Sequence, residues 1–222
     1  EPKKSFTKKH TIMRTTFKAM LALAVAAIFG LGARAQDVAI KTNLLHDAGA
    51  VANLGLEFGL APKWTLDIST DVNYWPVKHG WWGHGSHQER RWERWWVQPE
   101  ARYWFCEKFQ GNFIALQVMG GMYNVGNIGF IPNFLNNRFK QLKDERWKGW
   151  GVGAGIAYGH AWTLGTHWNL EAEIGIGWIY SRYDRWSIDK ANGGKLQNKI
   201  QDNKVHNYVG PTKLAVNLEY VF

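Results

Sequence analysis

A serine, an aspartate and a histidine near the C-terminal end could together perform nucleophilic chemistry. Ser181, Asp184 and His206 are the residue types of a hydrolytic triad, in which the histidine takes the serine proton and the carboxylate orients the histidine. Side chains alternate along a strand, so Ser181 shares a face with Glu171 and Glu173, which we expect to point into a barrel. A lipid ester would approach from the opposite side. We therefore predict that the protein is not an enzyme, with an outer-membrane lipid-modifying hydrolase as the alternative.

A histidine-rich tract could hold a metal ion at the surface. His79, His84 and His87 lie among glycines and tryptophans, and imidazole nitrogens suit zinc and copper. The glycines make this spacing undemanding, and neither a cysteine nor a carboxylate lies between the three histidines. A solvated loop is the favoured interpretation, and we predict no metal and no cofactor.

A basic and aromatic cluster follows the histidine tract. Such residues could stack on nucleic-acid bases or hold the phosphates of lipopolysaccharide. The cluster consists of Arg90, Arg91, Trp92, Arg94, Trp95 and Trp96. Because the chain begins with an apparent export signal, we predict no nucleic-acid partner. An anchor at lipid headgroups is favoured, with outer-membrane lipid and lipopolysaccharide as expected partners.

The positive charge of the chain is concentrated at its beginning. The 222 residues carry 27 lysines and arginines against 18 acids, a net charge of +9, but residues 1–35 hold seven of the bases and one acid. Residues 13–35 have the form of a signal peptide, with a basic start, an apolar run of about thirteen residues and a small-residue cleavage site. This run is too short for a membrane helix. Residues 1–12 stay unassigned, and residues 36–222 form the expected mature domain.

The mature part alternates between apolar and polar residues almost throughout, which is typical of β-strands. The pattern predicts eight strands, over residues 38–45, 53–60, 64–75, 91–105, 113–125, 149–162, 168–183 and 208–222. Short connections alternate with long polar ones, and many strands approach the ten residues of a membrane-crossing strand. The predicted fold is all-β, an eight-stranded antiparallel up-and-down transmembrane β-barrel in the bacterial outer membrane. A soluble exported lipocalin-like binding barrel is the alternative.

Aromatic residues near the predicted strand ends favour the membrane barrel. Membrane barrels carry aromatic girdles at both interfaces. The candidates here are Trp64, Trp75, Trp150, Trp162, Trp168, Trp178 and the C-terminal Phe222. The final aromatic residue also looks like the signal by which the barrel-assembly machinery recognises its clients, so this machinery is an expected partner.

Several segments resemble a family of exported Bacteroidetes proteins that is catalogued only as a domain of unknown function. The resemblance covers essentially the whole mature chain. It rests on residues 39–45, 53–66, 97–105, 168–175 and 208–213. The resemblance implies an outer-membrane barrel of the OmpA/OmpX kind, sometimes associated with fimbrial genes, and it supplies no catalytic residues. A structural or surface-interaction role follows, such as adhesion, with a surface or fimbrial protein as the possible partner.

Charged residues at the strand positions that point into the barrel predict a lumen that is plugged by polar side chains. The expected network consists of Lys41, Glu57, Asp67, Glu100, Arg102, Glu171, Glu173, Lys213 and Glu219. Buried charges must be paired, so Lys41 should lie beside Glu219, and Arg102 should bridge acids in the space left by glycines of the sixth strand. Leu214 and Val216 should face lipid. Pro99 lacks an N–H and should mark a local bulge.

Overall fold

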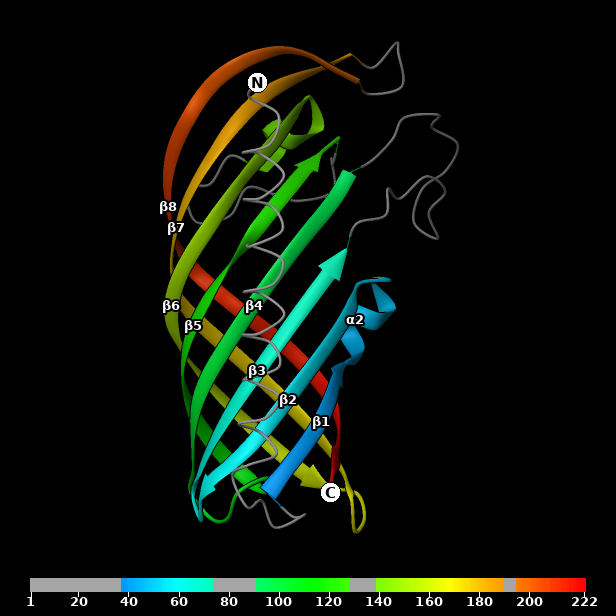
Figure 1. Cartoon of the computed structure of the whole chain (residues 1–222), viewed down its shortest axis with the longest axis vertical. Helices are drawn as coiled ribbons and strands as arrows, with labels where there is room; N and C mark the ends of the chain where they lie inside the picture. Colours follow the sequence, from blue (N-terminus) through cyan, green and yellow to red (C-terminus); the bar gives the residue numbers. More distant parts are fainter. Residues whose placement is uncertain (1–36, 74–90, 128–138, 190–194) are drawn as a thin grey trace, which may run out of the picture. The chain divides into compact units, whose positions relative to one another are not determined.

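The computed structural model describes residues 37–73, 91–127, 139–189 and 195–222. The elements are β1 (Val38–Asn43), α2 (Leu44–Ala48), β2 (Ala52–Ala61), β3 (Trp64–Asn73), β4 (Arg91–Trp104), β5 (Gly111–Gly126), η2 (Phe139–Lys143), β6 (Glu145–Thr163), β7 (Trp168–Asp189) and β8 (Lys195–Val221) (Figure 1). The expected signal peptide, Trp75, Arg90 and the three histidines of the 79–87 tract lie outside the described residues.

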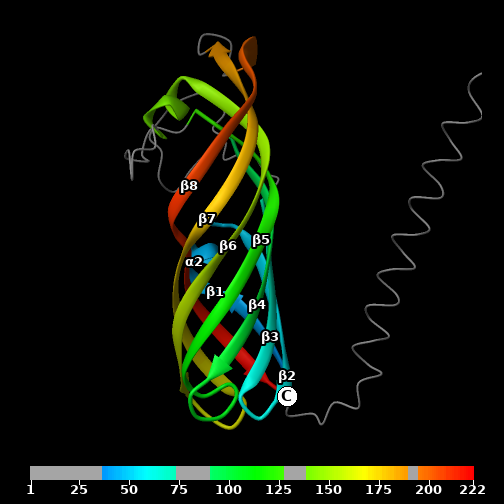
Figure 2. The same cartoon turned by 90° about the vertical axis from the view of Figure 1, so that its left-hand side faces the viewer.

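The strands form one closed antiparallel barrel in sequence order, with β1 paired to β8. This confirms the predicted all-β class and the ring of eight antiparallel strands. The short β2–β3, β4–β5 and β6–β7 connections lie at the same end as the C-terminus, which we call the turn end (Figure 2). We call the opposite end the loop end. Within the described residues, no helix is long and apolar enough to cross a membrane.

Several predicted strand limits are wrong. The loop expected over residues 184–207 is largely a continuation of β7 to Asp189 and of β8 from Lys195. These extensions carry polar residues on both faces, so they lack the alternation by which a half-buried strand is found. The first strand was expected to reach residue 45 but ends at Asn43. The Asn43 side chain accepts a hydrogen bond from the Leu45 N–H and caps the short helix α2.

Pro99 does not produce the expected bulge. It pairs with Ile68 of β3, while the pairing of β4 with β5 stops at Val97 and resumes at Glu100 in the same register. A missing N–H removes a ladder bond without requiring an extra residue. The ring therefore accommodates proline by interrupting one ladder and leaving the register unshifted.

The barrel has polar residues inside and apolar residues outside. Its buried set includes Glu57, Asp67, Arg102 and Glu171, all with no exposed surface. Large apolar side chains such as Leu214, at 65% exposure, cover the outer face. The row Leu214, Val216 and Leu218 alternates with buried Ala215, Asn217 and Glu219, as the period of two predicts.

Candidate functional site

Arg102 is the centre of a charged network in the lumen near the turn end. Its guanidinium is completely buried, and Nη1 donates to Glu57 and Glu171 at 2.8 Å each. Nη2 donates to Glu173 at 2.8 Å and to Glu100 at 3.1 Å. A planar guanidinium with five N–H groups can serve several carboxylates in this way. The predicted bridging of acids by Arg102 is confirmed.

Lys41 joins the network from the neighbouring side of the barrel. Its Nζ donates to Glu57 and lies 3.3 Å from Asp67, 3.5 Å from Glu171 and 3.8 Å from Glu219. Lys41 is also the direct pairing partner of Glu219 between β1 and β8. The prediction that Lys41 lies beside Glu219, where β8 closes the barrel against β1, is confirmed.

Lys213 completes the network, so the structure brings all nine predicted lumen residues together. Its Nζ lies 2.5 Å from Glu100 and 3.0 Å from Glu173. Six carboxylates thus surround three cations. Neutral groups absorb part of this acidic excess, since Asn217 donates to Glu171 at 2.6 Å and Asn169 to Glu219 at 3.1 Å. Sequence parity alone would have placed both asparagines inward.

The space beside the glycines of β6 is filled differently from the prediction. A Cβ at Gly159 would meet the Phe113 ring, and one at Gly155 would meet the Gln117 amide. Arg102 instead lies over the Phe113 ring, 4.5 Å from its centroid. Gly155 and Gly159 therefore make room for neighbouring β5 side chains, because adjacent strands are closer than residues across the lumen.

Three carboxylates of the network could in principle hold a metal ion. Glu57, Glu171 and Glu219 each offer an oxygen within 4.8 Å of the others. The Oε2 atoms of Glu57 and Glu171, however, both contact the Lys41 and Arg102 cations. These positive groups already neutralise the acids, so the geometry favours ion pairing within the chain.

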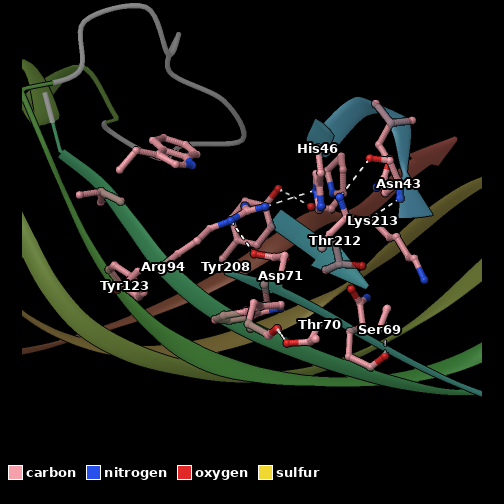
Figure 3. A pocket seen from close by; sticks show the side chains of 18 of the residues that line it. Asn43, His46, Ser69, Thr70, Asp71, Arg94, Tyr123, Tyr208, Thr212 and Lys213 are labelled. Atoms are coloured by element: carbon pink, nitrogen blue, oxygen red, sulfur yellow. Dashed lines mark hydrogen bonds and ion pairs between the residues drawn. The ribbon is translucent and has the colours of Figure 1, made fainter. Parts of the chain in front are cut away.

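An aromatic cavity of about 540 Å³ lies on the loop-end side of the charged network (Figure 3). Leu142 of η2 packs against Trp147 and Tyr183 over part of it, and Trp92 and Tyr123 join this cluster. The charged floor of the cavity includes Lys213 and Lys41, which also belong to the network. Sequence reasoning missed this cavity, because its η2 roof lies in a stretch that we expected to be loop.

A polar group lies at one wall of the cavity. The Arg94 Nε lies 2.7 Å from Asp71, and its Nη2 is 3.3 Å from His46 Nε2 (Figure 3). Burial, followed by the Arg94 charge, lowers the pKa of His46 to about 4. His46 is therefore neutral near pH 7, and Nε2 accepts the hydrogen bond from arginine, leaving Nδ1 to carry the ring proton.

The structure brings together only part of the Ser181, Asp184 and His206 set on which the alternative hydrolase interpretation rests. The Ser181 hydroxyl is hydrogen bonded to Tyr123, and Ser181 pairs with His206 across the β7–β8 ladder. Asp184 accepts from the Asn203 N–H at 2.9 Å, and this bond, with Lys199, lowers the pKa of Asp184 to about 2. Asp184 thus binds within the β7–β8 hairpin, to the Asn203 N–H and to Lys199.

The sequence of this chain matches a known protein family along nearly its whole length. The model of a family described as a protein of unknown function, DUF3575, matches residues 19–222. The chain belongs to the DUF3575 family. No curated protein and no solved structure matches it. The domain of unknown function expected from the sequence segments is confirmed, and the all-β ring is the fold of this DUF3575 chain.

The predicted aromatic residues of the DUF3575 barrel point outward where they are described. Each is between 41% and 50% exposed, and the set comprises Trp64, Trp150, Trp162, Trp168, Trp178 and Phe222. The cluster around Arg94 divides between the two faces. Trp95 is outward and exposed, whereas Trp92, Arg94 and Trp96 line the cavity. Arg94 points into the barrel and pairs with Asp71, and the expected anchoring of the cluster at lipid headgroups stays a prediction.

Proposed function

We propose that the protein is an outer-membrane β-barrel with a structural or surface-interaction role, whose lumen is plugged by the charged network. The observation that carries the proposal is the inverted distribution of polarity. A soluble barrel turns its apolar residues inward, whereas here Glu57, Arg102 and Glu171 are buried and Ile156, Ile174 and Leu214 are exposed. An outer face of this kind is stable in hydrocarbon and would aggregate in water.

The positions of the exposed tryptophans support the same proposal. Trp150 and Trp162 bracket the middle of β6, and Trp168 and Trp178 bracket the beginning of β7. Both stretches are close to the ~9–11 tilted residues that cross a bilayer. Indole rings prefer the two interfaces, where an apolar ring and a polar N–H are both satisfied.

The extensions of β7 and β8 support a role outside the membrane. Both strands continue past Trp178 and its partner Val209 toward Asp189 and Lys195. Exposed polar side chains, including Lys199 and Asp202, cover this hairpin. Display of such a surface fits contact with another surface protein, for which a fimbrial or adhesive partner is the expected class.

Cysteine labelling of intact cells tests the location and orientation. The natural Cys106 is exposed in the β4–β5 connection at the turn end. We expect an impermeant maleimide to leave Cys106 unlabelled in whole cells and to label it after outer-membrane permeabilisation. Gln197→Cys, placed at an exposed site on β8 in a Cys106→Ser background, should react in whole cells.

Two outcomes would contradict this proposal. Equal reactivity of both positions in the soluble periplasmic fraction would indicate a soluble barrel. A steady conductance of the purified wild-type protein in a planar bilayer would contradict the plugged lumen, because the interior of an eight-stranded barrel is just wide enough to be filled by side chains such as Arg102 and its partners.

A further inference from the structure

The wall of the barrel is incomplete between α2 and β8. Pairing of β1 with β8 ends at Asn43 and Asn217, and pairing of β1 with β2 ends at Lys41 and Gly55. Among the described residues, the part of β8 before Asn217 has strand partners only in β7. The short helix α2, which has no buried residue, stands where β1 would otherwise continue.

The aromatic cavity extends to this break in the wall. Its lining includes Leu54 of β2 and Leu214 of β8, two exposed residues of the outward face on either side of α2. Thr212 and Lys213 approach from β8, opposite Asn43 and His46 (Figure 3). Since no strand pairing closes the wall at this point among the described residues, we infer a lateral opening of the cavity beside α2.

The walls of the cavity differ from those of a water-filled barrel. The interior of a membrane barrel is normally polar, yet Leu142, Trp147 and Tyr183 form a buried apolar cluster here. The volume of about 540 Å³ falls within the range of ligand pockets, roughly 300–1,000 Å³. Most of the surface that lines the cavity is apolar, which suits a hydrocarbon chain, although charged residues such as Asp71, Arg94 and Lys213 also line it.

We propose that this cavity binds one acyl chain of a membrane lipid, which enters from the bilayer through the opening between α2 and β8. The proposal rests on the membrane location proposed above, because the opening faces lipid only in an embedded barrel. The chain would lie against Trp147 and Tyr183, where both lose contact with water.

A cavity-filling substitution tests the binding. Ser69 lines the cavity, and its neighbour Ile68 faces outward on the same strand. In native mass spectrometry of protein reconstituted with palmitoyl lysophosphatidylcholine or palmitate, the wild type should retain one molecule of at least one probe. Ser69→Phe should weaken this binding by about tenfold or more, and the matched Ile68→Phe should not. Absence of a retained probe, or equal effects of the two variants, would overturn the proposal that the cavity binds an acyl chain.

A crosslink across the opening tests the route. In a Cys106→Ser background, Leu45→Cys and Leu214→Cys can be joined by a flexible bifunctional thiol reagent, since α2 and β8 border the opening. Joining them should slow probe exchange by about tenfold. The control pair Ile156→Cys and Ile176→Cys, paired outward positions of β6 and β7, should not change the rate. Equal exchange with both crosslinks would overturn lateral entry.

Insertion into liposomes separates this inference from the proposed function. If the wild type inserts but retains neither probe, the acyl-chain proposal fails and the membrane location stands. If the wild type stays in the aqueous phase, the proposed location and lateral entry from a bilayer both fail, whatever binds in the cavity.

Discussion

The two ends of the barrel interior are built from opposite kinds of side chain. Near the turn end, Arg102, Lys41 and Lys213 are surrounded by carboxylates. Toward the loop end, aromatic residues such as Trp147 and Tyr183 enclose an open volume. Under the proposals made above, the charged end holds the strands together and the aromatic end provides the space for an acyl chain.

The largest expected effect is the loss of Arg102. Arg102→Ala leaves several buried carboxylates without their shared cation, which should cost about 3–5 kcal/mol of unfolding free energy. Urea unfolding in detergent micelles, followed by tryptophan fluorescence, measures this loss. The control is Lys199→Ala, which removes an exposed cation of the β7–β8 hairpin and should leave the midpoint unchanged. Equal midpoints for the two variants would remove the distinction between the two regions.

The next effect compares the two faces of β8. Val216→Arg places a charge against lipid and should destabilise the barrel by about 2–4 kcal/mol near the bilayer centre. Asn217→Arg places the same charge beside Glu171, in a network with more carboxylates than cations, and should cost less. Folding yield in liposomes and the urea midpoint report both changes. A larger loss for Asn217→Arg would show that the acidic excess is already neutralised.

Hydrogen bonds at the two ends of the barrel interior should differ by a smaller amount in their contribution to the free energy of unfolding. Asn217→Ala removes a bond to the Glu171 carboxylate and should cost about 1.5–3 kcal/mol, as bonds to charged groups do. Ser181→Ala removes the bond to Tyr123 beside the cavity, a neutral pair that should contribute about 1 kcal/mol. Reversed magnitudes in the same unfolding measurement would argue against a stabilising turn end.

The period of two was sufficient to predict the charged end from the sequence. Glu57, Asp67 and Arg102 sit at alternate positions of strands whose other face is apolar, so burial and pairing followed from parity alone. The aromatic end was harder to predict from the sequence. The β7–β8 extension has no buried face to impose alternation, and α2 depends on the Asn43 side chain bonding to the Leu45 N–H. Such local hydrogen bonds compete with a strand without changing the apolar pattern.

The side chains that fill the space beside the β6 glycines show a second limit of prediction from the sequence. The sequence shows that Gly155 and Gly159 leave space, but which side chain enters it depends on register and strand stagger. Residues Gln117 and Phe113 pair directly with these glycines in the β5–β6 ladder. Arg102, one strand further away, reaches the acids instead.

The smallest expected effect is a pH dependence at the cavity wall. The pKa of His46 falls from 6.5 to about 4 on folding, so the unfolded chain takes up this proton first. Its contribution to stability is therefore present above pH 6.5 and is lost as the pH falls through about 4. His46→Gln should lose less stability than the wild type between these pH values. Parallel pH profiles of the two proteins would place the His46 pKa near its ordinary value.

Quenching of tryptophan by brominated phospholipid tests the inverted barrel most directly. Trp162 is outward and 48% exposed, whereas Trp104 is fully buried and donates to Thr65 at 2.9 Å. In bilayers of brominated lipid, Trp162→Phe should reduce the quenchable part of the fluorescence, and Trp104→Phe should reduce only the unquenched part. Quenching that is lost with Trp104 and kept with Trp162, or a protein that does not enter the bilayer, would contradict a barrel with its apolar face in lipid.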